Sequence, residues 1–69
     1  MITLRMLGKL LVHTNIFIYT HEEPNYKYLF YRDREEIPNS LLDKEVVMVR
    51  GVVDNDPKIG AGVEIHLKI

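Results

Sequence analysis

The stretch Gly62-Val-Glu-Ile-His-Leu-Lys-Ile69 alternates apolar and polar residues without interruption. Its apolar residues are Val63, Ile65, Leu67 and Ile69, and its polar residues are Glu64, His66 and Lys68. Because successive side chains of a strand point to opposite faces, this period of two predicts a half-buried β-strand. The C-terminal stretch therefore indicates a fold built on β-sheet.

The segment before this strand also has the composition of a strand. Residues 45–54 are apolar and β-branched on both faces around Arg50, which predicts a strand that is covered on both sides. Gly51 in its middle predicts a bulge or bend. Between the two strands, residues 55–62 contain Pro57 and two glycines, so we expect a flexible connection there.

Three more strands are predicted in the first half of the chain. Residues 16–21 alternate in character, residues 26–33 are rich in β-forming residues, and a loop at residues 22–25 separates them. Residues 3–13 carry Leu4, Met6, Leu10 and Val12 at alternate positions, with Gly8 as a second bend and Thr14-Asn15 as a tight turn. The apolar residues of 3–12 also lie three and four positions apart, so a helix stays open for this segment.

Residues 34–44 lose the period of two. Pro38 suits the first position of a helix, Asn39 or Ser40 offers a capping side chain, and one turn would carry Leu41 and Leu42 to the end of a barrel. The predicted fold is therefore all-β: a five-stranded OB-type Greek-key barrel, a single domain over residues 1–69, with one short helix between strands 3 and 4. SH3-like and Sm-like barrels place their helix elsewhere and fit this order less well.

Two stretches carry a resemblance to a known superfamily. Residues 37–53, with the alternating strand at 63–69, resemble the second half of OB-fold nucleic-acid-binding domains, and Tyr28-Leu-Phe-Tyr-Arg-Asp33 is similar to the third strand of anticodon-binding OB domains. The resemblance implies binding of single-stranded DNA or RNA. The same fold also serves as a protein-binding subunit of larger assemblies, so a structural protein–protein interaction subunit is the alternative.

Aromatic and basic residues give this expectation a location. If Ile16 and Ile18 point inward, Phe17, Tyr19 and His21 point outward, and the next strand adds further residues to a binding face. The candidate nucleic-acid-binding residues are Phe17, Tyr19, Tyr28, Phe30, Lys9, Lys27, Arg32 and Arg34. Bases stack on such rings for about 1–3 kcal/mol each. The alternative that Tyr28 or Phe30 is a core residue stays open. The flanking carboxylates would repel phosphate; they are Glu22, Glu23, Glu35 and Glu36.

Catalysis has little support in the sequence. Ser40, the one serine, lies at the predicted helix start, and the three histidines are spread over three predicted strands rather than paired at metal-ligand spacing. A metal site at His21 with the neighbouring glutamates is less favoured than a solvated loop. Gly60-Ala-Gly62 precedes a strand and so lacks the helix N-terminus of a phosphate loop. We expect no enzyme, no catalytic residue, no metal and no other cofactor.

Size and composition bear on partners and location. The chain has 69 residues, no cysteine and a net charge of −1, so neither a disulfide nor bulk electrostatic attraction to nucleic acid is expected. Without a long apolar run or cysteines, the expected location is the cytoplasm, with no membrane contact. Because so short a chain buries little apolar surface, we also expect a homodimer or a protein partner, held through edge strands or the apolar N-terminal segment.

Overall fold

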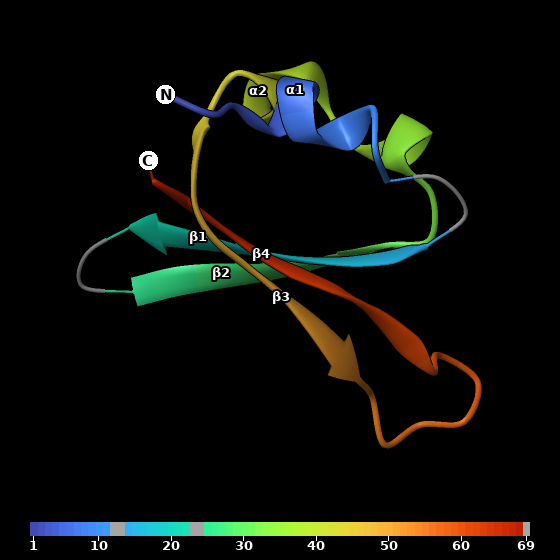
Figure 1. Cartoon of the computed structure of the whole chain (residues 1–69). Coiled ribbons are helices and arrows are strands. Elements are labelled where there is room, and N and C mark those ends of the chain that lie inside the picture. The colour runs from blue at the N-terminus through green and yellow to red at the C-terminus, as the bar shows by residue number, and fades with distance from the viewer. Residues whose placement is uncertain (12–13, 23–24, 69) are drawn as a thin grey trace.

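The fold consists of a four-stranded sheet with short helices (Figure 1). The computed structural model describes residues 1–11, 14–22 and 25–68, and of residues 22, 25 and 26 it describes the backbone alone. The elements in chain order are α1 (Leu4–Gly8), β1 (Asn15–Glu22), β2 (Asn25–Tyr31), the 3₁₀ helix η1 (Arg34–Glu36), α2 (Asn39–Leu42), β3 (Glu45–Val53) and β4 (Ala61–Lys68).

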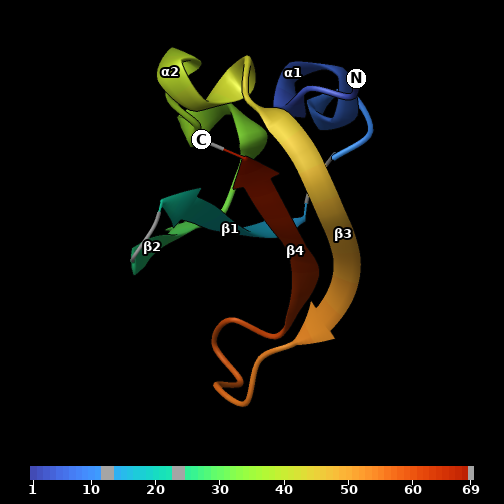
Figure 2. The same ribbon diagram turned by 90° about the vertical axis from the view of Figure 1, so that its left-hand side faces the viewer.

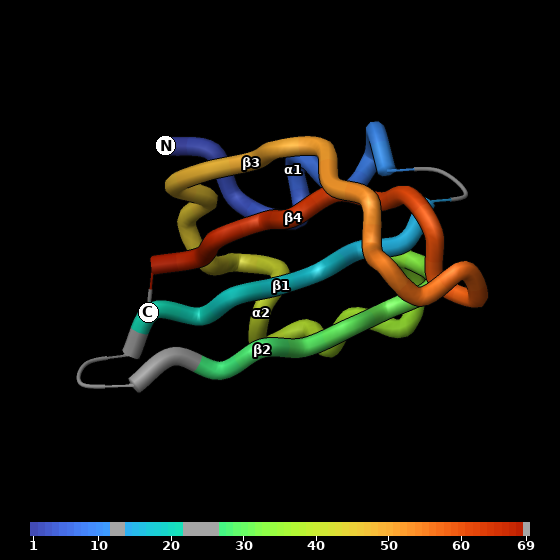
Figure 3. Tube along the Cα trace, turned by 90° about the horizontal axis from the view of Figure 1, so that it is seen from below, coloured from blue at the N-terminus to red at the C-terminus, as the bar shows by residue number. Residues whose placement is uncertain are grey.

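The strands form one open mixed sheet in the order β2-β1-β4-β3, and Figure 3 shows them side by side in this order. β1 runs antiparallel to β2 and parallel to β4, so Ile18 lies between Leu29 on one side and Ile65 on the other. β3 pairs antiparallel with β4, and the register shifts between Val46 and Met48. The two central strands thus come from opposite ends of the chain.

The core lies between the sheet and the helices, which all cover the same face (Figures 1 and 2). Its buried residues are Leu4, Leu11, Ile16, Ile18, Ile37, Ile65 and Leu67. Half-buried residues from β2 and α2, such as Leu29, Leu41 and Leu42, pack against them. The prediction that Leu41 and Leu42 close the end of a barrel is therefore wrong, because the two residues pack against the core on one face of an open sheet.

The prediction of a five-stranded OB-type barrel is wrong. The sheet has four strands among the described residues and does not close, because residues 4–8 form a helix instead of a first strand. Without that strand, no described strand bridges β2 and β3, which remain the two edges of the sheet. No helix of the described part of the chain is both long enough and apolar enough to span a membrane.

For residues 3–12 both a strand and a helix were open. Two local features explain why the helix α1 forms in this segment. The hydroxyl of Thr3 accepts a hydrogen bond from the backbone N–H of Met6 and so caps the helix. Leu4, Leu7 and Leu11 follow the helical period toward the core, whereas the alternate residues Met6 and Leu10 are exposed. Val12 and His13, the end of the predicted strand, lie outside the described residues.

The other four predicted strands are confirmed as β1 to β4, with corrected details. The irregularity in β3 lies between Val46 and Met48, so the bulge predicted at Gly51 is wrong. Val47 and Val49 are exposed, so β3 is not covered on both faces. α2 lies where a helical turn was expected, but Pro38 precedes it and no side chain caps its start.

The pairing of β1 with β4 requires glycine at position 62. A Cβ atom there would lie 2.5 Å from the carbonyl oxygen of Asn15 and 2.7 Å from a ring carbon of Phe17, whereas a Cβ at Gly51 would meet nothing within 4 Å. We therefore expect Gly62→Ala to reduce the free energy of unfolding by about 1–3 kcal/mol through overpacking. The control Gly51→Ala should stay within about 0.5 kcal/mol of the parent.

Urea denaturation of the three proteins, followed by circular dichroism, measures this difference. Equal stabilities for the two alanine variants would contradict the close approach of β1 and β4.

Candidate functional site

The face of the sheet opposite the helices carries a row of aromatic rings. We call this surface the open face; its residues are Phe17, Tyr19 and His21 of β1, Tyr28 and Phe30 of β2, Met48, Arg50 and Val52 of β3, and Glu64 and His66 of β4. Directly paired residues of neighbouring strands share a face, so the register of the sheet assembles this set. The sequence-based expectation that Phe17 and Tyr19 lie opposite Ile16 and Ile18 agrees with this arrangement.

The rings contact one another across β1 and β2. The ring centroids of Phe17 and Phe30 are 5.1 Å apart, those of Tyr19 and Tyr28 are 5.0 Å apart, and Phe17 stacks on Tyr28 at 6.3 Å. These distances are typical of favourable aromatic pairs. The four aromatic residues predicted as a binding face are therefore brought together.

Their exposure differs, however. Phe17 is only 4% exposed and forms the floor of the row, whereas Tyr28 is 49% exposed, and Tyr19 and Phe30 are half-buried. Removal from water, more than the nearby Tyr19 and Asp54, raises the pKa of Tyr28 above its ordinary value. The Tyr28 hydroxyl is therefore protonated at neutral pH and can donate a hydrogen bond to a ligand.

A buried carboxylate anchors the other half of the open face. Glu64 is 7% exposed, and its Oε2 accepts hydrogen bonds from Nε of Arg50 at 2.5 Å and from Nε2 of His66 at 3.0 Å. The bond from Arg50, followed by that from His66, holds the pKa of Glu64 below its ordinary value. The carboxylate is therefore ionised, and its charge is compensated by Arg50.

This polar chain continues from His66 to His21. Since the ionised Glu64 can only accept, Nε2 of His66 carries the proton toward it. Nδ1 of His66 lies 2.6 Å from Nε2 of His21, within hydrogen-bonding distance. The Tyr19 ring stacks on the His66 ring at a centroid distance of 4.8 Å and 12°, which fixes the imidazole plane.

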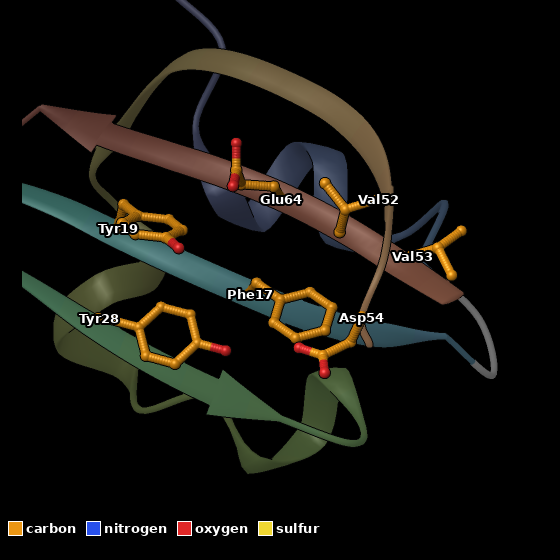
Figure 4. Close-up of a pocket in the computed structure, with 7 residues that line it drawn as sticks. All are labelled: Phe17, Tyr19, Tyr28, Val52, Val53, Asp54 and Glu64. Carbon is orange, nitrogen blue, oxygen red and sulfur yellow. The ribbon is translucent and has the colours of Figure 1, made fainter. Parts of the chain in front are cut away.

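A small hollow opens between the aromatic row and the end of β3 (Figure 4). It is lined by Phe17, Tyr19, Tyr28, Val52, Val53, Asp54 and Glu64, and its volume is about 120 Å³. This is well below the roughly 300–1,000 Å³ of sites that enclose a drug-sized ligand. The hollow can take the edge of one flat ring, while the rest of a ligand would lie along the sheet.

Of the four predicted basic residues, one lies with the rings. The Arg32 guanidinium carbon is 5.5 Å from the centroid of Phe30, a cation–π contact on the open face. Lys27 pairs with Thr20 and so belongs to the opposite face of the sheet. Arg34 donates from Nη1 to the carbonyl oxygen of Gly8 at 2.8 Å, and together with Lys9 it lines a second hollow among the helices.

Sequence reasoning missed the cation of β3 and the carboxylate of β4. Arg50 and Glu64 pair across neighbouring strands, and only the register of β3 with β4 reveals this contact. Of the carboxylates expected to oppose phosphate, Glu35 and Glu36 belong to η1 in the helical layer, and the side chains of Glu22 and Glu23 are outside the described part. The described residues contain no group of three or more metal-ligating side chains placed to hold an ion.

Comparisons with known proteins identify no relative. No protein-family model, no curated protein and no solved structure matches the chain. The function is therefore inferred from the geometry of the open face.

The ionised state of Glu64 links stability to pH. A carboxyl whose pKa is lowered on folding stabilises the protein above its unfolded pKa, and this stabilisation is lost as pH falls through the folded pKa. We expect Glu64→Gln to be less stable than the parent at pH 7, with a difference that shrinks as the pH falls below about 4.5, the ordinary carboxyl value.

Urea unfolding at several pH values between about 3 and 7 measures this convergence. Glu36→Gln, which removes the same charge from an exposed position in η1, is the control and should stay close to the parent. A Glu64→Gln deficit that stays constant with pH would contradict the ion pair.

Proposed function

We propose that this chain is a non-enzymatic binding module that holds single-stranded nucleic acid on the open face of its sheet. The observation that carries the proposal is the half-exposed Tyr28 ring, set beside Tyr19 and Phe30, with Arg32 at the end of the row. A four-stranded sheet with aromatic rings on one face is a known means of stacking two or three unpaired bases.

The aromatic row supplies a surface for bases. Tyr28 and Phe30 are two residues apart on β2, so they face the same side at successive positions along one strand. Phe17 beneath them packs against both rings, with its ring centroid 6.3 Å from that of Tyr28 and 5.1 Å from that of Phe30. A base that stacks on Tyr28 would thus meet a ring that is already held in place.

The charges around the row suit a phosphate backbone. Arg32 lies at the Phe30 end, and the side chain of Arg50, 63% exposed, lies on β3, across β4 from the row, where it is bound to Glu64. Because Glu64 is buried and already compensated, it does not oppose a phosphate as a free carboxylate would. Since Arg50 is paired with Glu64, Arg32 supplies the positive charge beside the rings, while the carboxylate of Asp54 lines the hollow at Phe17 and Tyr28.

Single-stranded nucleic acid fits this surface better than a duplex does. The rings need access to the faces of bases, and these faces are free only where bases are unstacked. Since ring stacking does not read the hydrogen-bonding edges of bases, the proposal includes both DNA and RNA and predicts weak sequence preference. The alternative of a protein-interaction subunit is favoured by a different observation, the exposed apolar residues of β3.

We expect Tyr28→Ala to weaken binding of a fluorescent single-stranded oligonucleotide by about 5- to 150-fold, which corresponds to about 1–3 kcal/mol for one stacked base. Fluorescence anisotropy at low salt measures the dissociation constant. Leu10→Ala, which removes an exposed apolar side chain from the helical side, is the control and should bind as the parent does.

A matched pair of cation variants tests the backbone contacts. Arg32→Gln should weaken binding and reduce the slope of log affinity against log salt by about one unit, because one phosphate contact is lost. Lys9→Gln removes the same charge from the helical side and should leave the slope unchanged. Equal effects of both variants, or no binding by the parent at low salt, would refute the open face as a nucleic-acid site.

A further inference from the structure

β3 is an edge strand, and the described residues cover its outer side only at its beginning. The backbone N–H of Val46 donates to the carbonyl oxygen of Ile2 at 2.8 Å, and Thr3 forms an isolated bridge with Glu45. Among the described residues, the part of β3 after Val46 pairs only with β4. Figure 2 shows this later part of β3 along the border of the molecule, extending away from the helices.

This uncovered part of β3 is apolar. Its exposed apolar residues, with their exposed fractions, are Val47 (53%), Met48 (41%), Val49 (43%) and Val53 (79%). Soluble proteins commonly protect an edge strand with proline or with charges, since its unpaired backbone groups accept another strand. β3 has no proline, and Arg50, its one charged residue after Glu45, is bound to Glu64.

We propose that β3 pairs antiparallel with β3 of a second copy of this chain, with the two-fold axis at Gly51. This register sets Val49 against Val53 of the second copy, twice per dimer, and Arg50 against Val52. Strand pairing then covers the backbone edge, and the exposed valines bury one another.

Registers centred earlier on β3 are less favourable. An axis at Arg50 would place two guanidinium groups opposite each other, and like charges in directly opposed positions destabilise a sheet. An axis at Met48 or Val49 would bring Val46 into the pairing, where Ile2 already occupies the edge. An axis at Val49 would also place Val53, the most exposed of the four, opposite the covered Glu45.

Pairing of β3 with β3 of a second copy is more favourable than pairing of β3 with β2, the opposite edge strand, of another copy. Pairing of β3 with β3 uses the same surface on both copies and closes after two chains, whereas pairing of β3 with β2 would propagate into a filament. β2 also presents the exposed Lys27, a residue type that discourages edge pairing. The dimer would be one eight-stranded sheet, with both open faces on the same side because opposed residues share a face.

Single-cysteine variants test the pairing directly, because the chain has no cysteine of its own. Directly opposed residues of antiparallel strands have Cα atoms about 4.5–5.5 Å apart, which fits a disulfide. A side chain at Gly51 meets no steric obstacle within the monomer. We expect Gly51→Cys to form a disulfide-linked dimer roughly 100-fold faster than Ser40→Cys, an exposed control on α2, because pairing raises the effective concentration of the thiols.

Light scattering and sedimentation of the parent and of Val49→Lys complete the test. The parent should show twice the monomer mass of 8.1 kDa at high micromolar concentration, and Val49→Lys should be a folded monomer. Leu10→Lys, the same change on the helical side, should remain a dimer. A parent that is monomeric at these concentrations, or faster linkage through Val49→Cys than through Gly51→Cys, would overturn the proposal. No nucleic acid is used, so the result is independent of the proposed function.

Discussion

The parallel pairing of β1 with β4 is the constraint on which the rest of the structure depends. It places Ile16 and Ile18, from the first third of the chain, beside Ile65 and Leu67 from its end, and all four are fully buried. Parallel neighbours cannot be joined by a tight turn, so the intervening chain must cross over the sheet. η1 and α2 lie on that crossover, and α1 joins them on the same face (Figure 1).

Because the helices lie on one face, side chains on the other face can be buried and hydrogen-bonded only by one another. Phe17 is buried there by neighbouring rings rather than by a second layer. Glu64 is buried beside it, and a buried carboxylate costs several kcal/mol unless it is paired and hydrogen-bonded. Arg50 and His66 supply those bonds, so the contact of β3 with β4 stabilises the same surface that we propose as the binding site.

The sequence allowed the strands to be predicted better than their arrangement. Alternation at residues 62–69 and 16–21 is a local property and located β4 and β1 correctly, with Phe17 and Tyr19 on the face opposite Ile16 and Ile18, although Phe17 is buried there. Residues 3–13 contain both the period of two of a strand and the three- and four-residue spacing of a helix. The hydrogen bond from the backbone N–H of Met6 to the Thr3 hydroxyl favours the helix. Barrel and open sheet differ in which distant strands pair, and alternation within one strand carries no information about that.

The same distinction explains the candidate site. The aromatic row comes from two strands that are consecutive in the chain, so sequence reasoning grouped Phe17 and Tyr19 with Tyr28 and Phe30. Lys9 and Arg34 were named with them as basic candidates, but both residues lie in the helical layer. Arg50 joins the open face through its bond to Glu64 of β4, a contact between residues 14 positions apart that no local pattern reveals.

β3 connects the two proposed surfaces through its own alternation. Arg50 and Val52 point to the open face, whereas Val49 and Val53 belong to the other face of the same strand. A lysine at position 49 would thus interrupt pairing of the edge without touching the Arg50–Glu64 ion pair, and a change at Glu64 would alter the open face without adding charge to the edge. Because strand geometry separates the two sets of side chains, dimer formation and ligand binding can be altered one at a time in this chain.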